Sequence, residues 1–229
     1  MTQEEFREII CPPHDQRMMI VGASGTGKTT LAREILRNYG RVLVIDPKCT
    51  YGDKKGEPGF TLVRSPRQLR SLNQGHTHIQ FRPGEDHQTL VAYNEVYEWA
   101  YRQGQRGVGY MVYTDEVYLV MAGSSSPKWL TNCITCGREL GVGMINGSQR
   151  PIGVDRRIFT ESETFVAFRL MHEDDAKLAL KRLRAFGEPE GHAFWIRHTS
   201  WTHPRYLELN LQQSLQTQRE PREALTANA

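Results

Sequence analysis

Residues 18–30 read MMIVGASGTGKTT, and this stretch decides the fold. Residues 18–21 are a run of apolar residues, which is typical of a strand buried on both faces of a parallel sheet. Residues 22–29 follow the pattern GxxxxGK(S/T), and the apolar residues from Lys28 to Tyr39 recur at helical spacing. A strand, a glycine-rich turn and a helix in direct succession predict a loop whose backbone N–H groups point toward phosphate.

This loop predicts a binding site for ATP and Mg²⁺. Lys28 is expected to reach the β- and γ-phosphates, and the Thr29 hydroxyl is placed to bind the metal. The helix that follows adds the partial positive charge of its N-terminus. The predicted nucleotide-binding residues are Gly22, Ala23, Ser24, Gly25, Thr26, Gly27, Lys28, Thr29 and Thr30. The alternative is a chance glycine-rich turn, which the strand and helix on either side disfavour.

A second motif follows the apolar run at residues 110–114, where Asp115 and Glu116 end a predicted buried strand. From that position Asp115 can hold Mg²⁺, and the carboxylate directly after it can orient and deprotonate a water molecule. A kinase that transfers phosphate to a small substrate would not need such a base. The pair therefore favours an ATPase that hydrolyses ATP, with Lys28 and Glu116 as catalytic residues. The alternative for Glu116 is a solvated side chain without a role.

Gln149 is a further catalytic candidate. It follows the strand predicted at residues 142–146, within the sequence Ser148-Gln149-Arg150-Pro151. Ligands of α/β proteins bind at the carboxyl ends of the strands, and this strand is expected beside the phosphate loop. An amide there can contact the γ-phosphate or the attacking water, whereas the alternative is an ordinary polar strand end.

The remaining sequence alternates short apolar runs with amphipathic stretches, which predicts an α/β fold with a mostly parallel sheet flanked by helices. Strands are predicted at residues 18–21, 41–45, 78–81, 110–114, 142–146 and 164–168, with edge strands at 193–196 and 206–209. Helices are predicted at residues 28–39, 90–101, 127–140 and 173–186. Local signals predict Gly40 as a helix C-cap, a turn at residues 104–107, and Ser126 as an N-cap before Pro127.

Length and composition are those of an ordinary soluble domain. The chain has 229 residues, of which 38% are hydrophobic and 24% charged, with a net charge of +3. These values predict a single domain over residues 1–211 and a polar tail over residues 212–229. No run approaches the roughly 18 apolar residues that cross a bilayer, and the acidic start differs from a secretory signal. Cys133 and Cys136 form a lone CxxC without a second pair for zinc. We therefore expect a protein without a membrane span that works in a cytoplasm or is carried by something assembled there.

Three further stretches suggest a family. They read VLVIDPKCTYG at residues 42–52, YMVYTDEVY at 110–118 and GRELGVGMINGSQRP at 137–151. Together with the phosphate loop, their order resembles the FtsK-HerA superfamily of DNA-pumping ATPases over roughly residues 17–175. The resemblance implies a RecA-like (ASCE) P-loop core, assembled as a hexameric ring that moves double-stranded DNA through its centre.

The resemblance also implies residue roles. Those of the family's motif positions carry over to Lys28, Thr29, Asp115, Glu116 and Gln149. Arg138 matches the family arginine that acts in trans on the ATP of a neighbouring subunit, and its alternative is a surface arginine at a helix end. Asp46 matches the family's Asp-Pro strand end and is expected near the nucleotide, with no assigned chemistry.

Within the superfamily, the sequence matches the motor core alone. We expect neither the membrane spans nor the winged-helix module of bacterial chromosome pumps, for which 229 residues leave no room, nor the HerA β-barrel, since only about 17 residues precede the first strand. It is similar to the minimal genome-packaging ATPases of tailless double-stranded DNA viruses (the tectivirus-like group). This similarity implies a packaging motor in the host cytoplasm or at the virion's packaging vertex, with capsid vertex or portal proteins as partners.

Other functions stay open at this point. They are a cellular or plasmid DNA-transfer ATPase of the same superfamily, an ATP-dependent regulatory switch without DNA translocation, and a small-molecule kinase, which Glu116 disfavours. A bare motor would contact DNA through loops, and basic side chains there would bind phosphates independently of base sequence. The candidate segments are residues 54–56, 102–106 and 123–128.

Overall fold

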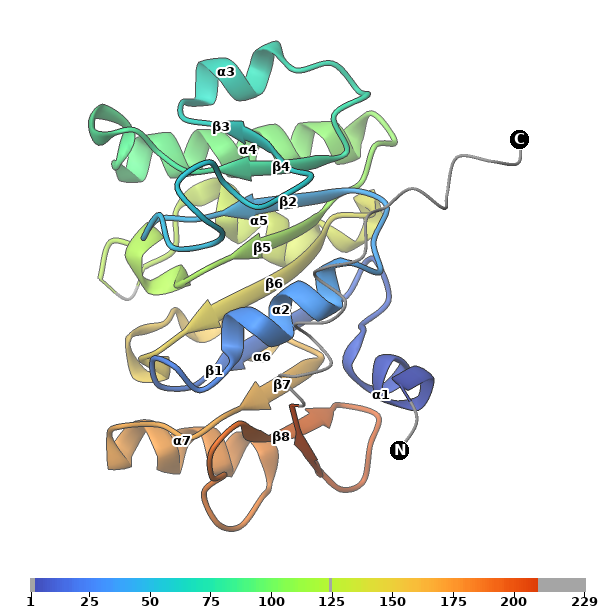
Figure 1. The fold of residues 1–229 in the computed structure, drawn as a ribbon, viewed down its shortest axis with the longest axis vertical. Helices are drawn as coiled ribbons and strands as arrows, with labels where there is room; N and C mark the ends of the chain where they lie inside the picture. The colour runs from blue at the N-terminus through green and yellow to red at the C-terminus, as the bar shows by residue number, and fades with distance from the viewer. Residues whose placement is uncertain (1–2, 124, 210–229) are drawn as a thin grey trace.

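A mostly parallel sheet forms the centre of the computed structural model, which describes residues 3–123 and 125–209. Its strand order is β3-β4-β2-β5-β6-β1-β7-β8-β9. The strands are β1 (Arg17–Val21), β2 (Val42–Ile45), β3 (Thr61–Val63), β4 (His78–Phe81), β5 (Met111–Thr114), β6 (Gly143–Ser148), β7 (Thr164–Ala167), β8 (Ala193–His198) and β9 (Arg205–Glu208). Strands β1 to β7 pair in parallel, and β8 and β9 add antiparallel pairs at one end (Figure 1). The predicted fold class is confirmed, while the predicted tail at 212–229 lies outside the described residues.

Helices cover both faces of this sheet. The α-helices are α1 (Gln3–Ile10), α2 (Lys28–Leu36), α3 (Pro66–Ser71), α4 (Leu90–Gln105), α5 (Lys128–Cys136), α6 (Arg156–Glu161) and α7 (Glu173–Leu183). Short 3-10 helices are η1 (Glu85–His87), η2 (Val117–Val120), η3 (Arg138–Leu140) and η4 (Pro151–Gly153). In Figure 1, α2 crosses the front face, whereas α4, α5 and α6 lie behind the sheet. No helix of the described residues is long and apolar enough to cross a membrane.

The two faces build two hydrophobic clusters. Because side chains alternate along a strand, Met18 and Ile20 of β1 pack with α2, while Met19 and Val21 pack with the helices behind the sheet. All four of these side chains are fully buried, as expected for a parallel strand covered on both sides. The apolar run before the phosphate loop therefore anchors that loop in the core.

Strand register brings the candidate residues to one edge. β6 lies between β1 and β5, with Val21 of β1 opposite Ser148, and Thr114 of β5 opposite Asn146. All three strands run in the same direction, so the residues that follow them emerge together at what we call the carboxyl edge. The predicted position of β6 beside the phosphate loop is confirmed. The opposite edge, where these strands begin, is the amino edge.

Two predicted boundaries around glycines are wrong. α2 ends at Leu36 rather than near Gly40, because the Asn38 side chain donates to the carbonyls of Glu34 and Ile35 at 2.8 and 3.0 Å. A side-chain amide thus satisfies the helix end for which the sequence predicts a glycine cap. Gly104 does not open a turn, since α4 continues through Gln105.

The position of Gly104 has a packing reason. A Cβ atom there would lie 2.6 Å from Cγ2 of Val142 and 2.9 Å from the carbonyl oxygen of Leu140. The glycine therefore lets α4 approach the segment before β6 closely, and the chain turns only at Gly107, whose φ is 76°.

The start of α5 also differs from the prediction. Pro127 is the N-cap and α5 begins at Lys128, because the Ser126 N–H donates to the Asp155 carboxylate at 3.1 Å. α5 ends at Cys136 instead of continuing to Leu140. The short elements α1, β3, α3 and α6 were absent from the prediction, since three to eight residues carry little periodicity.

Candidate active site

The phosphate loop joins β1 to α2 and closes on its own backbone. Gly25 and Gly27 have φ of 76° and 109°, in the left-handed region that favours glycine. The Thr26 hydroxyl and the Lys28 ammonium both donate to the Ala23 carbonyl, at 2.9 and 2.8 Å. Gly27 is the N-cap of α2, so the partial positive charge of that helix faces the space beside the loop.

A pocket of about 400 Å³ opens at the carboxyl edge beside this loop. Its lining residues are Ser24, Gly25, Gly27, Lys28, Thr29, Thr30, Lys48, Thr50, Asp115, Glu116, Gln149 and His192. Of the predicted loop residues, Gly22, Ala23 and Thr26 do not line it and instead shape the backbone. The pocket thus gathers Lys28, Thr29, Asp115, Glu116 and Gln149 from three strand ends.

Thr29 and Asp115 offer two oxygen ligands side by side. The Thr29 Oγ1 lies 3.5 Å from Oδ1 of Asp115, and that same carboxylate oxygen accepts a 2.8 Å hydrogen bond from Tyr113. Burial raises the pKa of Asp115 above its usual range. One hydroxyl and one carboxylate fit Mg²⁺, which keeps several waters and binds through few protein oxygens together with phosphate. In keeping with this donor set, no cluster of three or more His, Cys, Asp or Glu side chains suited to a metal occurs within the described ranges.

Lys28 is a buried cation. Burial lowers the pKa of Lys28 to about 8, although the nearby carboxylates of Glu116 and Asp115 act in the opposite direction. A phosphate group in the pocket would favour the charged ammonium, because opposite charges in a poorly solvated site attract strongly. The affinity of this site for phosphate is therefore coupled to proton uptake near physiological pH.

Glu116 is held by three donors. Its Oε1 accepts from the Gln149 backbone N–H at 2.9 Å and from the Ser148 hydroxyl at 3.1 Å. Its Oε2 lies 3.2 Å from the ammonium of Lys48. The residue is only 6% exposed, and its backbone is left-handed with φ of 71°. The alternative that Glu116 is a solvated side chain without contacts is therefore wrong. A left-handed backbone at a residue other than glycine is strained, and such strain is typical of functional sites.

Three lining residues were missed by the sequence analysis. Lys48 and Thr50 follow Asp46, whose buried carboxylate accepts from the Thr50 N–H at 3.0 Å and from the Arg82 guanidinium at 3.0 Å. Asp46 itself lies outside the pocket and fixes the loop that carries Lys48. Lys48 lies three residues after the end of β2, and a residue that follows the carboxyl end of a parallel strand could have been predicted to line the pocket. His192, whose Nδ1 lies 3.1 Å from the Thr26 carbonyl oxygen, had no such signal, since it comes from just before β8.

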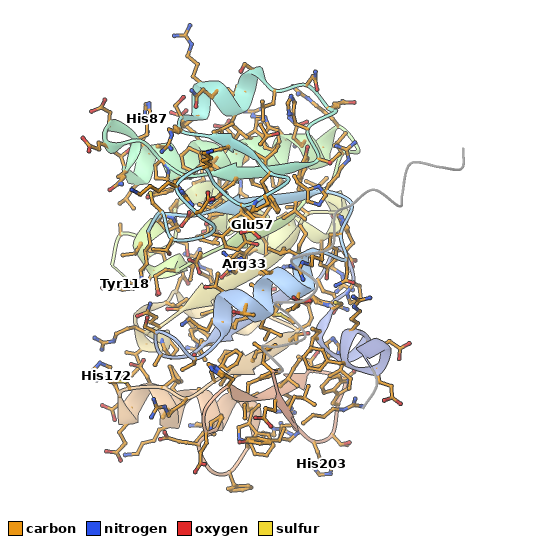
Figure 2. All side chains as sticks on the ribbon, viewed as in Figure 1. Arg33, Glu57, His87, Tyr118, His172 and His203 are labelled. Atoms are coloured by element: carbon orange, nitrogen blue, oxygen red, sulfur yellow. The ribbon has the colours of Figure 1, made fainter. Side chains whose placement is uncertain are left out.

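The loop that carries Lys48 is also tied to α2. Arg33 of α2 forms a 3.2 Å ion pair with Glu57 and lies 4.8 Å from the centre of the Tyr51 ring. Figure 2 shows Arg33 and Glu57 together on the front face, away from the carboxyl edge marked by Tyr118. These contacts hold the loop after β2 against the helix that begins at the phosphate loop.

Arg138 lies apart from this pocket. It begins η3, just before β6, and therefore stands at the amino edge. Its side chain is 53% exposed and lies 3.4 Å from Asp15 and 3.5 Å from Glu163. The arginine does not join the pocket of its own chain, as its predicted role in trans requires.

The candidate DNA-binding segments do not form one surface. Residues 54–56 lie in the loop between β2 and β3, with Gly56 beside Gln80 and Leu62, whereas residues 123–128 lie between β5 and α5, and residue 124 is outside the described chain. Residues 102–106 end α4 at the amino edge. Arg102 is held there by Glu98, at 2.9 and 2.6 Å from its Nε and Nη2.

Comparison with known proteins supplies structural neighbours only. No protein-family model matches the chain, and no curated protein matches its sequence. The genome-packaging NTPase B204 from Sulfolobus turreted icosahedral virus 2, in complex with ATP-gammaS, superposes with a TM-score of 0.70 at 12% identity. The match covers 87% of this chain and all of that one. The chain has the fold of a P-loop NTPase.

Two longer proteins contain the same fold. The pCW3 conjugation coupling protein TcpA matches with a TM-score of 0.55 at 11% identity, over 90% of this chain and 65% of its own. EssC ATPases 2 and 3 from Geobacillus thermodenitrificans match with a TM-score of 0.58 at 14% sequence identity. That match covers 89% of this chain and 42% of the EssC chain. This is the fold that the resemblance to the FtsK-HerA superfamily predicts.

Proposed function

We propose that this chain is an ATPase of the FtsK-HerA superfamily that hydrolyses Mg-ATP. The observation that carries the proposal is the position of Glu116, buried at the rim of a pocket that also holds Lys28, Thr29 and Asp115. A carboxylate in that place can accept a proton from the attacking water.

The residues that line the pocket have different roles in binding and hydrolysis. Lys28 and the N–H groups of the loop bind the phosphates, and Thr29 with Asp115 would hold Mg²⁺. The metal supplies positive charge that offsets the charge developing on the phosphate oxygens. Gln149 offers an amide in the same pocket to orient the water or the γ-phosphate.

Lys48 completes the arrangement around Glu116. Since Oε1 accepts from Ser148 and Gln149, the carboxylate cannot rotate freely, and Oε2 remains for the water and for Lys48. The ammonium of Lys48 also lines the pocket. Lys48 thus positions the base through this ion pair.

We further propose that hydrolysis drives translocation of double-stranded DNA by a hexameric ring that packages a viral genome. Support comes from a likeness in fold to B204 over the full length of that packaging NTPase. The place of Arg138 adds to it, because this arginine stands at the amino edge, away from the nucleotide pocket of its own chain, and could act only on ATP bound to a second copy. The motor would act in the host cytoplasm or at the packaging vertex, with capsid vertex or portal proteins as partners.

A DNA-transfer ATPase is the second candidate, since a conjugation coupling protein shares the fold. This chain spans less than two thirds of that protein, so partners of the longer protein do not transfer. A regulatory switch would bind ATP but would need neither DNA nor Arg138.

The test measures steady-state ATP hydrolysis with and without duplex DNA. Glu116→Gln should lower the rate by about 10²–10⁴-fold while ATP binding persists, because the amide cannot accept the water proton. Glu161→Gln, an exposed glutamate on α6, is the matched control and should hydrolyse at the wild-type rate.

The subunit arrangement is tested by mixing Glu116→Gln with Arg138→Ala. Partial recovery of DNA-stimulated hydrolysis is expected, since a mixed interface can pair an intact Arg138 with an intact Glu116. Hydrolysis indifferent to DNA, together with a fully active Arg138→Ala, would reduce the protein to an ATPase or switch without translocation.

A further inference from the structure

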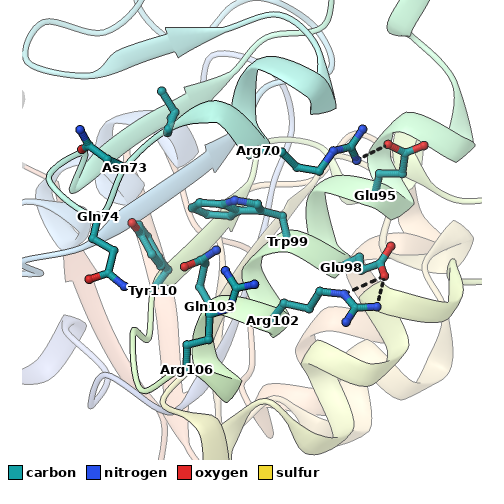
Figure 3. A pocket seen from close by; sticks show the side chains of 11 residues that line it. Arg70, Asn73, Gln74, Glu95, Glu98, Trp99, Arg102, Gln103, Arg106 and Tyr110 are labelled. Atoms are coloured by element: carbon teal, nitrogen blue, oxygen red, sulfur yellow. Dashed lines mark hydrogen bonds and ion pairs between the residues drawn. The ribbon is translucent and has the colours of Figure 1, made fainter.

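A second pocket, of about 640 Å³, lies at the amino edge of the sheet, whereas the active site lies at the carboxyl edge. The C-terminal half of α4, the end of α3 and the segment before β4 surround it, and Tyr110 closes it beside β5. Figure 3 shows Gln103, Arg106 and Tyr110 beside the Trp99 ring. Its volume is in the range of small-ligand sites.

Two largely buried side chains of this pocket carry polar groups without a partner among the described residues. Gln103 is 8% exposed and Trp99 is 9% exposed, and neither the Gln103 amide nor the Trp99 indole N–H forms a hydrogen bond within the described part of the chain. Neither group is sealed from solvent, so both face the pocket. Both groups are therefore accessible from the pocket and, without a protein partner among the described residues, can bond to a ligand that enters it.

Arg106 differs from the other two arginines that line the pocket. Arg70 is paired with Glu95 at 2.7 Å, and Arg102 with Glu98 at 2.6 Å, both drawn as dashed lines in Figure 3. Arg106, among the described residues, has no ion pair or side-chain hydrogen bond. One guanidinium is thus left to bind an anion, beside the unpaired amide and indole.

The walls of the pocket are preformed. Arg41 donates to the Gln74 carbonyl at 3.0 Å, and the Tyr110 hydroxyl donates to the His76 carbonyl at 2.9 Å. The Trp99 and Tyr110 rings pack with centroids 5.2 Å apart. A site whose walls are held by the protein itself loses little entropy when a ligand binds.

The free groups are mostly donors: an indole N–H, side-chain amides and a guanidinium. We propose that this pocket binds a phosphate group, either free phosphate or a phosphate of a DNA backbone. Phosphate oxygens accept several hydrogen bonds at once, and arginine is the side chain best suited to them. The site is separate from ATP hydrolysis and does not depend on the proposed function.

Binding measurements on variants test the site. Radiolabelled inorganic phosphate is followed by equilibrium dialysis with the active site saturated by ADP, and a fluorescent duplex DNA is followed by anisotropy. Arg106→Gln and Gln103→Leu should each weaken binding of the true ligand by about tenfold, the loss expected for one charge-assisted or buried hydrogen bond. Arg67→Gln and Gln105→Leu, exposed neighbours that do not line the pocket, are the matched controls.

The two binding assays distinguish free phosphate from the DNA backbone as the ligand of this pocket. Loss of inorganic phosphate binding in both variants, with controls like wild type, supports a free-phosphate site. Loss confined to duplex DNA supports a contact with the DNA backbone. Binding of both ligands unchanged in Arg106→Gln and Gln103→Leu, or equal losses in the controls, would overturn the proposal. Neither arm involves hydrolysis, so the result is independent of whether the protein is a motor.

Discussion

The carboxyl and amino edges of the sheet hold polar side chains in different ways. At the carboxyl edge, Lys28, Asp115 and Glu116 are each less than a tenth exposed and hydrogen-bonded within the site. At the amino edge, Arg138 is 53% exposed with ion pairs of 3.4 and 3.5 Å, and Arg106 is exposed without a described partner.

This difference indicates what each edge requires. Buried groups that bond to one another keep their geometry without help, since the surrounding protein makes other arrangements costly. Exposed arginines with long ion pairs contribute little stability and can exchange partners readily. The carboxyl edge is therefore organised by this chain alone, and the amino edge presents groups to whatever approaches it. Four changes test that contrast.

The largest expected effect tests whether Arg138, at the amino edge, acts on the active site of a neighbouring subunit. Arg138→Ala should lower ATP hydrolysis by about 10³-fold or more, because an arginine supplied in trans contributes about 10³–10⁵ in related NTPases. The affinity of the variant for ATP should stay near that of the wild type, since Arg138 lies far from its own pocket. Rates and dissociation constants are measured together, with Arg67→Ala as the exposed control; full activity of Arg138→Ala would leave the two edges unconnected.

The next effect concerns the loop after β2. Lys48→Met should reduce the rate of hydrolysis by about tenfold or more, because removal of the cation leaves the buried Glu116 carboxylate without its ion pair. Lys48→Arg should recover most of the rate, and Lys181→Met on the exposed face of α7 should match wild type. A rate for Lys48→Met equal to wild type would mean that Ser148 and the Gln149 N–H position the base unaided.

A smaller effect comes from the titration of Lys28. Because the pKa of Lys28 is about 8, a rise in pH through that value removes the charge that attracts phosphate. The affinity for Mg-ATP should therefore fall about tenfold between pH 7 and pH 9, one unit above the pKa. In Lys28→Arg the guanidinium stays charged, so any remaining affinity should not change over this range. Calorimetric titrations at several pH values measure both, and a flat profile for the wild type would contradict the assignment.

The smallest effect tests packing at the amino edge. Gly104→Ala should lower the free energy of unfolding by about 1–3 kcal/mol, because its Cβ would lie 2.6 Å from Val142. Gly40→Ala, at a site with no atom within 4 Å of the added carbon, should change stability by less than about 0.5 kcal/mol. Thermal or denaturant unfolding of the two variants compares them directly. Equal stabilities would show that α4 can shift at little cost.

Predictions from local sequence were accurate where a motif dictates its own backbone. The run at residues 18–21, the glycines of the loop and the helix from Lys28 follow one another without a break, so strand, turn and helix could be placed directly. Asp115 and Gln149 lie at the predicted edge because each directly follows a strand of the parallel part of the sheet. Two local predictions failed because a distant residue contacts the position, Asp155 at Ser126 and Val142 at Gly104, and the predicted end of α2 failed because Asn38 caps the helix locally.

The sequence by itself determined the class of fold, the phosphate loop and the residues at the strand ends, because these depend on contiguous patterns of apolar side chains and glycines. Only the tertiary structure decided which side chains meet: Lys48 with Glu116, His192 with the phosphate loop, and Gln74 in one pocket with Gln103. It also placed Arg138 at the edge away from its own pocket. These contacts join segments far apart in the chain, and their geometry follows from strand order and packing, which no local pattern encodes.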